Sequence, residues 1–224
     1  MIVYQYIMIC TLSKIEIFFM KHSLKIAAAL LAAGTVLVSC AGTLVNLKYQ
    51  NKQFVNKRLG LAYNAAPTTY QPYSIGEPYG YFKDSDMTLY QIIGTDPKEW
   101  LSQELAGSAT TIFYNEDITL PTLETLGADR IYLCTNTEAT AVVATVEDPG
   151  LIAQVVDLFL NGTPAEWPLI DSELTLDIKF YSEENYPFLF YNLQYGEFPE
   201  GKFLYDRNTK HCVEVGEIFA DYVD

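Results

Sequence analysis

The strongest constraint on the fold is a strict alternation of apolar and other residues over positions 174–181. The apolar positions are Leu174, Leu176, Ile178 and Phe180. Successive side chains of a β-strand point to opposite faces, so the pattern predicts a strand with one face on a core and the other toward solvent. Residues 187–195, 202–206 and 211–215 are also strand-like and are separated by polar turns. The C-terminal part is therefore expected to form an antiparallel β-meander.

Two segments, 97–106 and 149–161, carry the start and stop signals of helices. Each begins at the proline of an Asp-Pro pair and ends before a glycine, residues that suit the N-cap, the first turn and the stop. In the second segment an apolar stripe is formed by Ile152, Val155, Val156 and Phe159, and it must pack on a sheet. The sequence predicts an α+β fold of mostly antiparallel sheets with two packed helices.

Further strand-like segments lie at 44–50, 53–64, 87–93, 110–116, 130–134 and 139–146. Strands therefore flank both helical segments, and the repeated order suggests an internal duplication. Two unrelated helices with the same cap chemistry explain the pattern equally well.

Tyrosines are abundant in residues 64–85, where prolines and glycines predict an irregular loop or edge segment. Binding residues concentrate on loops held by a rigid scaffold. Tyr70, Tyr73, Tyr79 and Tyr81 are therefore the candidate ligand-binding residues. A second candidate surface is the polar face of the meander, with Tyr181, Tyr191 and Tyr195. The alternative is that these rings simply fill and flank strands.

Residues 20–40, MKHSLKIAAALLAAGTVLVSC, determine where the chain is expected to reside. Lys21 and Lys25 precede an apolar run over 26–38. The run is shorter than the roughly 20 residues that span a bilayer but has the length of a signal-peptide core. It ends in Leu37-Val38-Ser39-Cys40.

This ending resembles the lipobox of bacterial lipoproteins, and the chain resembles cell-envelope lipoproteins of the Gram-positive type. The resemblance implies cleavage between Ser39 and Cys40 and a diacylglyceryl group on the Cys40 thiol. It also implies a protein held on the extracytoplasmic side of the cell membrane. Two acyl chains anchor stably where one is marginal. An ordinary signal peptide, or a short buried helix with a chance cysteine, is the alternative.

The predicted organisation has four parts. Residues 1–19 are interpreted as an over-extended start, with a genuine second hydrophobic segment as the alternative, and 20–39 as the lipoprotein signal peptide. Residues 40–112 form a β-rich part, and 113–224 an acidic α+β part that either stands alone or shares one domain with 40–112. No run of 18 apolar residues follows Cys40.

Charge is unevenly distributed along a chain with a net charge of −14. Residues 113–224 hold 21 acidic and five basic residues. This excess repels phosphate backbones, so nucleic acid is not expected as a partner, and it also disfavours an anionic membrane surface. The basic cluster Lys48, Lys52, Lys57 and Arg58 lies close to the anchor, where each cation near an anionic surface adds about 1 kcal/mol. Exposed hairpin faces are the alternative interpretation.

Cys134 and Cys212 remain as a pair once Cys10 is removed with the leader and Cys40 carries lipid. Both fall on the strand faces opposite the expected core, where a free thiol would be exposed. A disulfide between them is one interpretation and two free thiols the other, since pairing requires Cα atoms within about 7 Å.

No motif for phosphate binding, dinucleotide binding, nucleophilic catalysis or zinc occurs, and no cofactor or metal is expected. His211 is the one histidine after Cys40, so any histidine-dependent catalytic triad would have to use it. The acid pairs Asp84/Asp86, Asp171/Glu173 and Glu183/Glu184 lie beside expected turns. The leading hypothesis is a non-catalytic binding module with a glycan or envelope-protein ligand. The alternatives are an accessory or sensor subunit of an envelope complex and a carboxylate-based hydrolase of cell-wall glycan.

Overall fold

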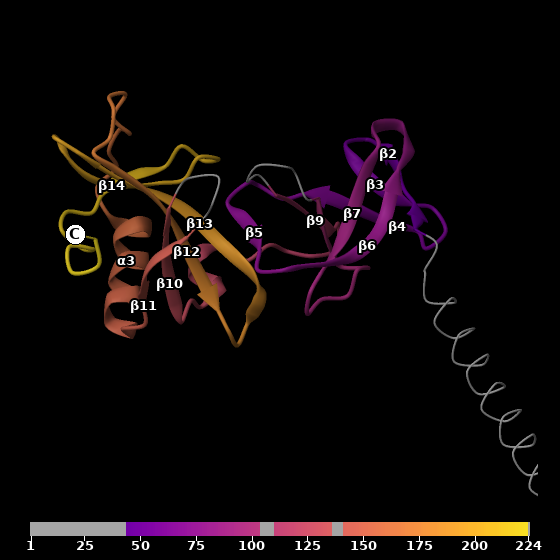
Figure 1. The fold of residues 1–224 in the computed structure, drawn as a ribbon, viewed down its shortest axis with the longest axis horizontal. Coiled ribbons are helices and arrows are strands. Elements are labelled where there is room, and N and C mark those ends of the chain that lie inside the picture. The colour runs from indigo at the N-terminus through magenta and orange to yellow at the C-terminus, as the bar shows by residue number, and fades with distance from the viewer. Residues whose placement is uncertain (1–43, 104–109, 136–140, 224) are drawn as a thin grey trace, which may run out of the picture. The chain divides into compact units, whose positions relative to one another are not determined.

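The computed structural model describes residues 44–103, 110–135 and 141–223, and these form a mostly β fold (Figure 1). Two sheets hold nearly all of the regular structure. The described helices are α2 (Leu123–Leu126), α3 (Pro149–Asn161) and the short 3₁₀ turn η1 (Lys83–Ser85). The prediction of an α+β fold with two packed helices is therefore wrong. Along the described chain, no helix has the length and apolar character needed to cross a bilayer.

The first sheet is a nearly closed, barrel-like sheet of eight strands in the order β1-β6-β7-β8-β9-β4-β3-β2. Its strands are β1 (Val45–Asn46), β2 (Lys48–Gln50), β3 (Gln53–Asn56), β4 (Leu61–Ala65), β6 (Ile75–Phe82), β7 (Met87–Ile92), β8 (Trp100–Gln103) and β9 (Thr111–Asn115). The outermost strands, β1 and β2, are consecutive along the chain and are separated only by Leu47. One segment therefore pairs with both edges, parallel to β6 and antiparallel to β3.

Leu47 is the residue through which the first sheet closes. It is 1% exposed and belongs to a core formed with Phe54, Tyr63, Leu89, Leu101 and Phe113. Its backbone N–H donates to the Tyr81 carbonyl at 3.1 Å. A Cβ on Gly80 would lie 2.6 Å from Leu47 Cδ1, so the glycine permits this close packing.

The predicted helix at 97–106 is the clearest local error over residues 97–103, and residues 104–106 lie outside the described ranges. The Asp96 carboxylate does accept the backbone N–H of Lys98 at 2.8 Å, but the residue begins a short turn over 97–99 that leads into a strand, and not a helix. Trp100, Leu101 and Ser102 are all buried in β8 between β7 and β9. Pairing on both sides and burial of consecutive residues outweigh the local cap signal. The two halves therefore do not share a strand–helix–strand unit, and the duplication interpretation is wrong.

The second sheet has the order β11-β10-β12-β13-β14-β15, and β5 also pairs with β13. Its strands are β5 (Tyr70–Pro72), β10 (Arg130–Thr135), β11 (Val142–Val146), β12 (Leu174–Ser182), β13 (Tyr186–Phe198), β14 (Gly201–Tyr205) and β15 (Cys212–Glu214). All of these pairings are antiparallel.

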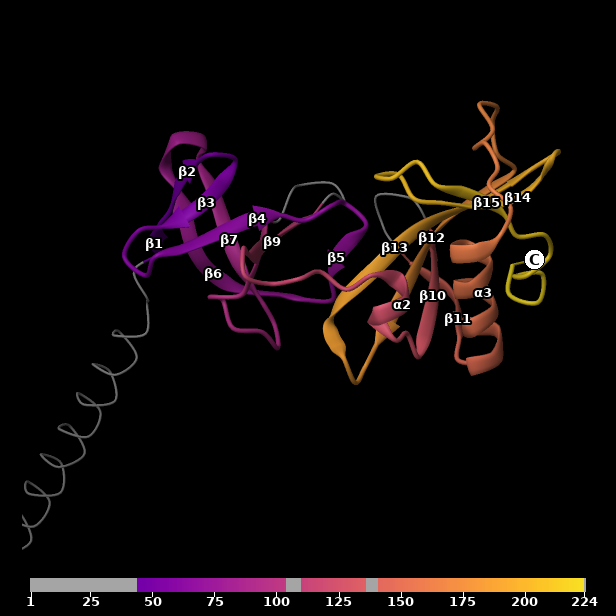
Figure 2. The ribbon, with the colours of Figure 1, turned by 180° about the vertical axis from the view of Figure 1, so that it is seen from behind.

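One face of the second sheet carries the main core and is covered by α3, with α2 nearby (Figure 2). Asp148 caps α3 by accepting the Leu151 N–H at 2.7 Å. The helix buries Ile152, Val155 and Phe159 against Leu133, Ile178 and other strand residues. This arrangement leaves the opposite face of β10, β12 and β13 free of helices in the described chain.

Residues 44–224 form one compact unit. β5 comes from the N-terminal half but pairs with β13. Residues of both halves also form one core cluster, which contains Tyr70, Trp100 and Leu189. The expected boundary at 112/113 divides β9. The parts 1–19 and 20–39 lie outside the described residues.

Candidate functional site

Four aromatic side chains gather on the helix-free face of the second sheet, and we call them the aromatic shelf. They are Tyr73, Tyr132, Tyr181 and Phe190. Tyr181 and Phe190 are direct cross-strand partners on β12 and β13. Tyr132 comes from the neighbouring strand β10. Tyr73 follows β5 and is fixed by its backbone N–H, which donates to the Phe188 carbonyl at 2.9 Å.

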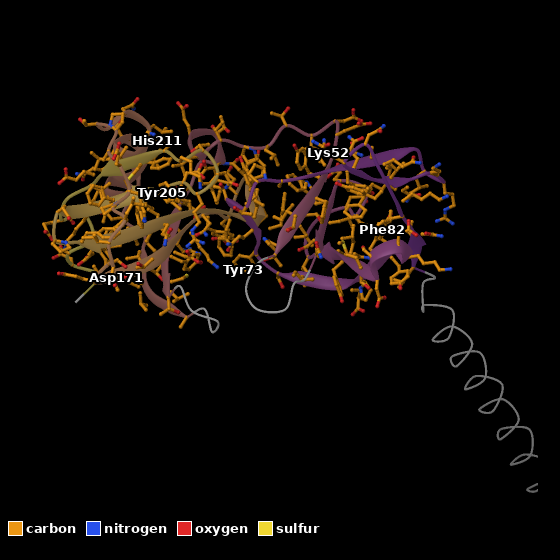
Figure 3. The ribbon with its side chains drawn as sticks, turned by 90° about the horizontal axis from the view of Figure 1, so that it is seen from above. Lys52, Tyr73, Phe82, Asp171, Tyr205 and His211 are labelled. Carbon is orange, nitrogen blue, oxygen red and sulfur yellow. The ribbon has the colours of Figure 1, made fainter. Side chains whose placement is uncertain are left out.

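Tyr73 is the outermost ring of the aromatic shelf (labelled in Figure 3). Its ring centroid lies 5.2 Å from those of both Tyr181 and Phe190, at interplanar angles of 37° and 35°. It is 51% exposed, whereas Tyr181 beneath it is 7% exposed. Burial raises the pKa of Tyr181. A partly exposed ring therefore rests on a rigid aromatic base, a geometry suited to stacking.

Two cations border the aromatic shelf. Arg130 Cζ lies 6.0 Å from the ring centroids of Tyr132 and Tyr181. Its guanidinium donates to the Tyr132 hydroxyl at 3.2 Å and pairs with Glu147 at 3.0 Å. The hydrogen bond to Tyr132 raises the pKa of Arg130, whose guanidinium is charged at neutral pH in any case. Because Arg130 is oriented by these partners, it is a fixed donor at the edge of the shelf.

Lys179 is the second cation, and its Nζ lies 5.4 Å from the Phe190 ring centroid. It forms no ion pair with any residue that the structure describes. Asp177 lies two residues away on the same strand face. Burial raises the pKa of Asp177, while Arg207 and Lys179 oppose that shift. The ammonium group of Lys179 thus remains available to a ligand beside the aromatic rings.

The four tyrosines predicted as one site do not converge. Tyr70 is buried and donates to the Pro121 carbonyl at 2.7 Å. Tyr79 packs on the barrel core, and the Tyr81 hydroxyl donates to Asp86 at 2.6 Å. Of the four, Tyr73 alone belongs to the shelf. The prediction of an irregular loop or edge segment over 64–85 is correct only for the short strand β5, which among the described strands pairs with β13 alone. It is wrong for β6, an eight-residue strand that pairs with both β1 and β7.

The second candidate surface was also only partly correct. Tyr181 does lie on the helix-free face, but Tyr191 and Tyr195 lie on the helix face. The cause is the register, since Tyr191 is opposite Phe180 and Tyr195 is opposite Leu176. Tyr132, Phe190, Arg130 and Lys179 were missed as site residues. Arg130 and Tyr132 share the polar face of their strand, but the pairing of β10 with β12 is not visible in the sequence.

The acids and the histidine considered for chemistry lie apart from the shelf, with one exception. Glu183 lies 3.7 Å from Arg130 as a second carboxylate partner. The His211 Nε2 atom lies 2.7 Å from the Phe159 carbonyl, and its ring packs on Phe159. No group of three or more metal-ligating side chains occurs within the described ranges. The shelf therefore offers stacking and hydrogen bonding rather than a nucleophile with a base.

Cys134 and Cys212 are both free thiols. They lie on β10 and β15, which are four strand steps apart in the sheet, about 19 Å at 4.8 Å per step. A disulfide between them is therefore excluded by the sheet order. The expectation that free thiols on this face would be exposed is wrong, because each is 2% exposed.

These thiols are expected to resist alkylation in the native protein. Burial raises the pKa of Cys134, and it raises that of Cys212 to about 11, so little thiolate forms at pH 8. Peptide mapping after iodoacetamide treatment should find both residues unmodified in native protein. Without any reductant, both should be fully modified in guanidinium chloride. A need for reductant would instead indicate disulfides.

Comparisons of the chain with protein-family models, with curated proteins and with solved structures find no match. Ser39 and Cys40, the residues of the expected cleavage and lipidation site, lie outside the described residues.

Proposed function

We propose that the protein is a lipid-anchored, extracytoplasmic module that binds an envelope glycan without catalysis. The observation that supports this most is the partly exposed Tyr73 ring, which packs at a tilt against Tyr181 and Phe190 in the aromatic shelf. A tyrosine face packs well against the apolar face of a sugar ring. Arg130, Lys179 and the tyrosine hydroxyls supply hydrogen bonds to sugar hydroxyls at the same surface.

The charge of the chain narrows the ligand class further. Residues 113–224, which carry most of the shelf, have 21 acidic and five basic residues. The negative electrostatic potential of these residues lowers the local concentration of polyanions and leaves that of neutral saccharides unchanged. We therefore propose an uncharged polysaccharide segment of the cell wall as the ligand. The lipobox-like residues 37–40 support the location that such a ligand requires.

Removing the Tyr73 ring tests this proposal. Tyr73→Ala should weaken retention on purified wall polysaccharide by about 30-fold or more, because loss of a central aromatic anchor typically costs at least about 2 kcal/mol. Tyr49→Ala is the matched control, since Tyr49 is 52% exposed on the other sheet. Equal retention of all three proteins would reject the shelf as the site. Release of soluble sugar by the wild type would favour the hydrolase alternative.

A second candidate function, an accessory subunit of an envelope complex, is favoured by a groove of about 490 Å³ between α2 and α3. Its apolar lining includes Leu123, Ile152, Ala153, Val156 and Leu160. Glu124, Asp129 and Asp157 border it, and none of its lining residues is basic. The groove therefore suits an apolar segment with basic neighbours.

A photo-reactive residue can decide between the two functions. Placed at Leu160, it should crosslink a basic, apolar segment of another envelope protein if the accessory function holds. The same residue at Gln154, exposed on α3 and outside the groove, is the control. No crosslink at 160, or equal crosslinks at both positions, would reject this second function.

A further inference from the structure

The chain enters the barrel at an end that carries exposed cations and exposed apolar side chains. We call Leu44, Lys48, Lys57, Arg58 and Leu59 the tether-side patch. All five are exposed, and Leu44 and Leu59 are each 44% exposed. None of the three cations forms an ion pair with a residue in the described ranges.

Strand pairing places these residues at one end of the barrel. Lys48 is the pairing partner of Val55, and β3 ends one residue later at Asn56. Because this pairing is antiparallel, the chain before Lys48 runs toward the turn that follows β3. Leu44 begins that chain, and Lys57, Arg58 and Leu59 form that turn. Lys52, labelled in Figure 3, lies beyond the other end of β3 and is not part of the patch.

The turn that carries most of the patch is held rigidly. The Leu59 N–H lies 3.2 Å from the Asn56 carbonyl and 3.3 Å from the Asn56 Oδ1 atom, both of which accept from it. Asn56 itself is fully buried. The exposed apolar side chain of Leu59 is therefore presented by a fixed backbone, together with the cations that precede it.

We infer that the tether-side patch docks on an anionic lipid surface, an inference that rests on the proposed anchor at Cys40. Three residues separate Cys40 from Leu44, so the four Cα–Cα steps of an extended chain allow at most about 14 Å between their Cα atoms. Screening leaves charge attraction effective over about 8–10 Å. A lipid-linked Cys40 therefore holds Lys48, Lys57 and Arg58 where anionic headgroups attract them.

The composition of the patch fits this surface. Exposed leucines beside lysine and arginine match the interfacial region, where apolar side chains enter the headgroup layer and cations meet lipid phosphates. Each cation near an anionic surface raises affinity about fivefold. The strongly acidic residues 113–224 disfavour contact of their own surface with the same headgroups. The barrel end, and not the shelf-bearing sheet, should therefore face the membrane.

The test uses mature protein purified from membranes and reconstituted into vesicles. An environment-sensitive fluorophore is attached at Leu59→Cys or, as a control, at Leu169→Cys, since Leu169 is a fully exposed leucine outside the patch. Cys134 and Cys212 are buried and should not be labelled under native conditions. On phosphatidylglycerol vesicles, the emission at position 59 should shift to shorter wavelength and be quenched by spin-labelled lipid. The emission at position 169 should do neither.

Charge reversal separates docking from anchoring. The double substitution Lys57→Glu and Arg58→Glu should lower the ratio of docked to undocked protein at least about 25-fold, while the protein still floats with the vesicles. Neutral phosphatidylcholine vesicles, used in place of the anionic ones, should lower the ratio of docked to undocked wild-type protein in the same way. If the protein floats with anionic vesicles but the fluorophore at position 59 emits as it does in water, the docking inference is overturned and the proposed anchor is not. Protein that does not float and carries no lipid would overturn the proposed anchor and the docking with it.

Discussion

Leu47→Ala should lower the free energy of unfolding by about 2–5 kcal/mol, the cost of a leucine-sized cavity in a packed core. Leu47 is 1% exposed and joins β1 to β2 at the closure of the barrel-like sheet. No other described strand pairs with the outer edges of β6 and β3. Loss of the side chain should therefore weaken the sheet at the point where its two edges meet.

Leu44→Ala is the matched control, because Leu44 lies three residues earlier and is 44% exposed. It should change the free energy of unfolding by less than about 0.5 kcal/mol. Urea denaturation followed by tryptophan fluorescence measures both, since Trp100 is buried in the described core. Equal, small effects of the two substitutions would mean that residues 45–50 are frayed from β6 and β3 and that the sheet is open.

The sequence contains enough local information to place α3 but not β8. An Asp-Pro pair and a following glycine occur at both segments. At 149–161 the apolar residues also repeat at helical spacing, so the cap and the packing agree. At 97–106 only the cap favours a helix, and pairing of Trp100 and Leu101 with two neighbouring strands decides the outcome.

Prolines misled the interpretation of residues 64–85 for a different physical reason. Pro78 lies within β6, at a position where the register with β7 shifts on both sides. A bulge tolerates the missing N–H of proline, so a proline-rich stretch can still be a strand. The sequence does not show which prolines coincide with bulges.

The aromatic shelf could be predicted only in part. Tyr73 was among the candidates, and the alternation in 174–181 places Tyr181 and Lys179 on the polar face. The remaining members depend on β10 pairing with β12 and on the register of β12 with β13, which puts Phe190 opposite Tyr181. β10 and β12 are far apart in the chain, and one sequence alone carries no signal for their pairing. β12 and β13 form a hairpin, but its register shifts between Tyr181 and Ser182, so the turn alone does not predict which residues face each other.

The second large effect concerns the proposed anchor. Cys40→Ala should move the protein from the membrane fraction to the soluble or secreted fraction. At about 0.8 kcal/mol per buried methylene, two acyl chains hold a protein stably, and without them only the weak tether-side patch remains. Cell fractionation with immunoblotting measures the shift. Ser39→Ala, which keeps a small residue at the expected cleavage site, is the control and should leave the protein in the membrane.

The proposed anchor is central to this account, because the envelope glycan and the docked barrel end both depend on it. Its most direct test is the intact mass of the protein extracted from membranes. The account predicts the mass of a chain that begins at Cys40 and carries a diacylglyceryl group. The mass of an uncut, unmodified chain recovered from the cytosol would contradict it.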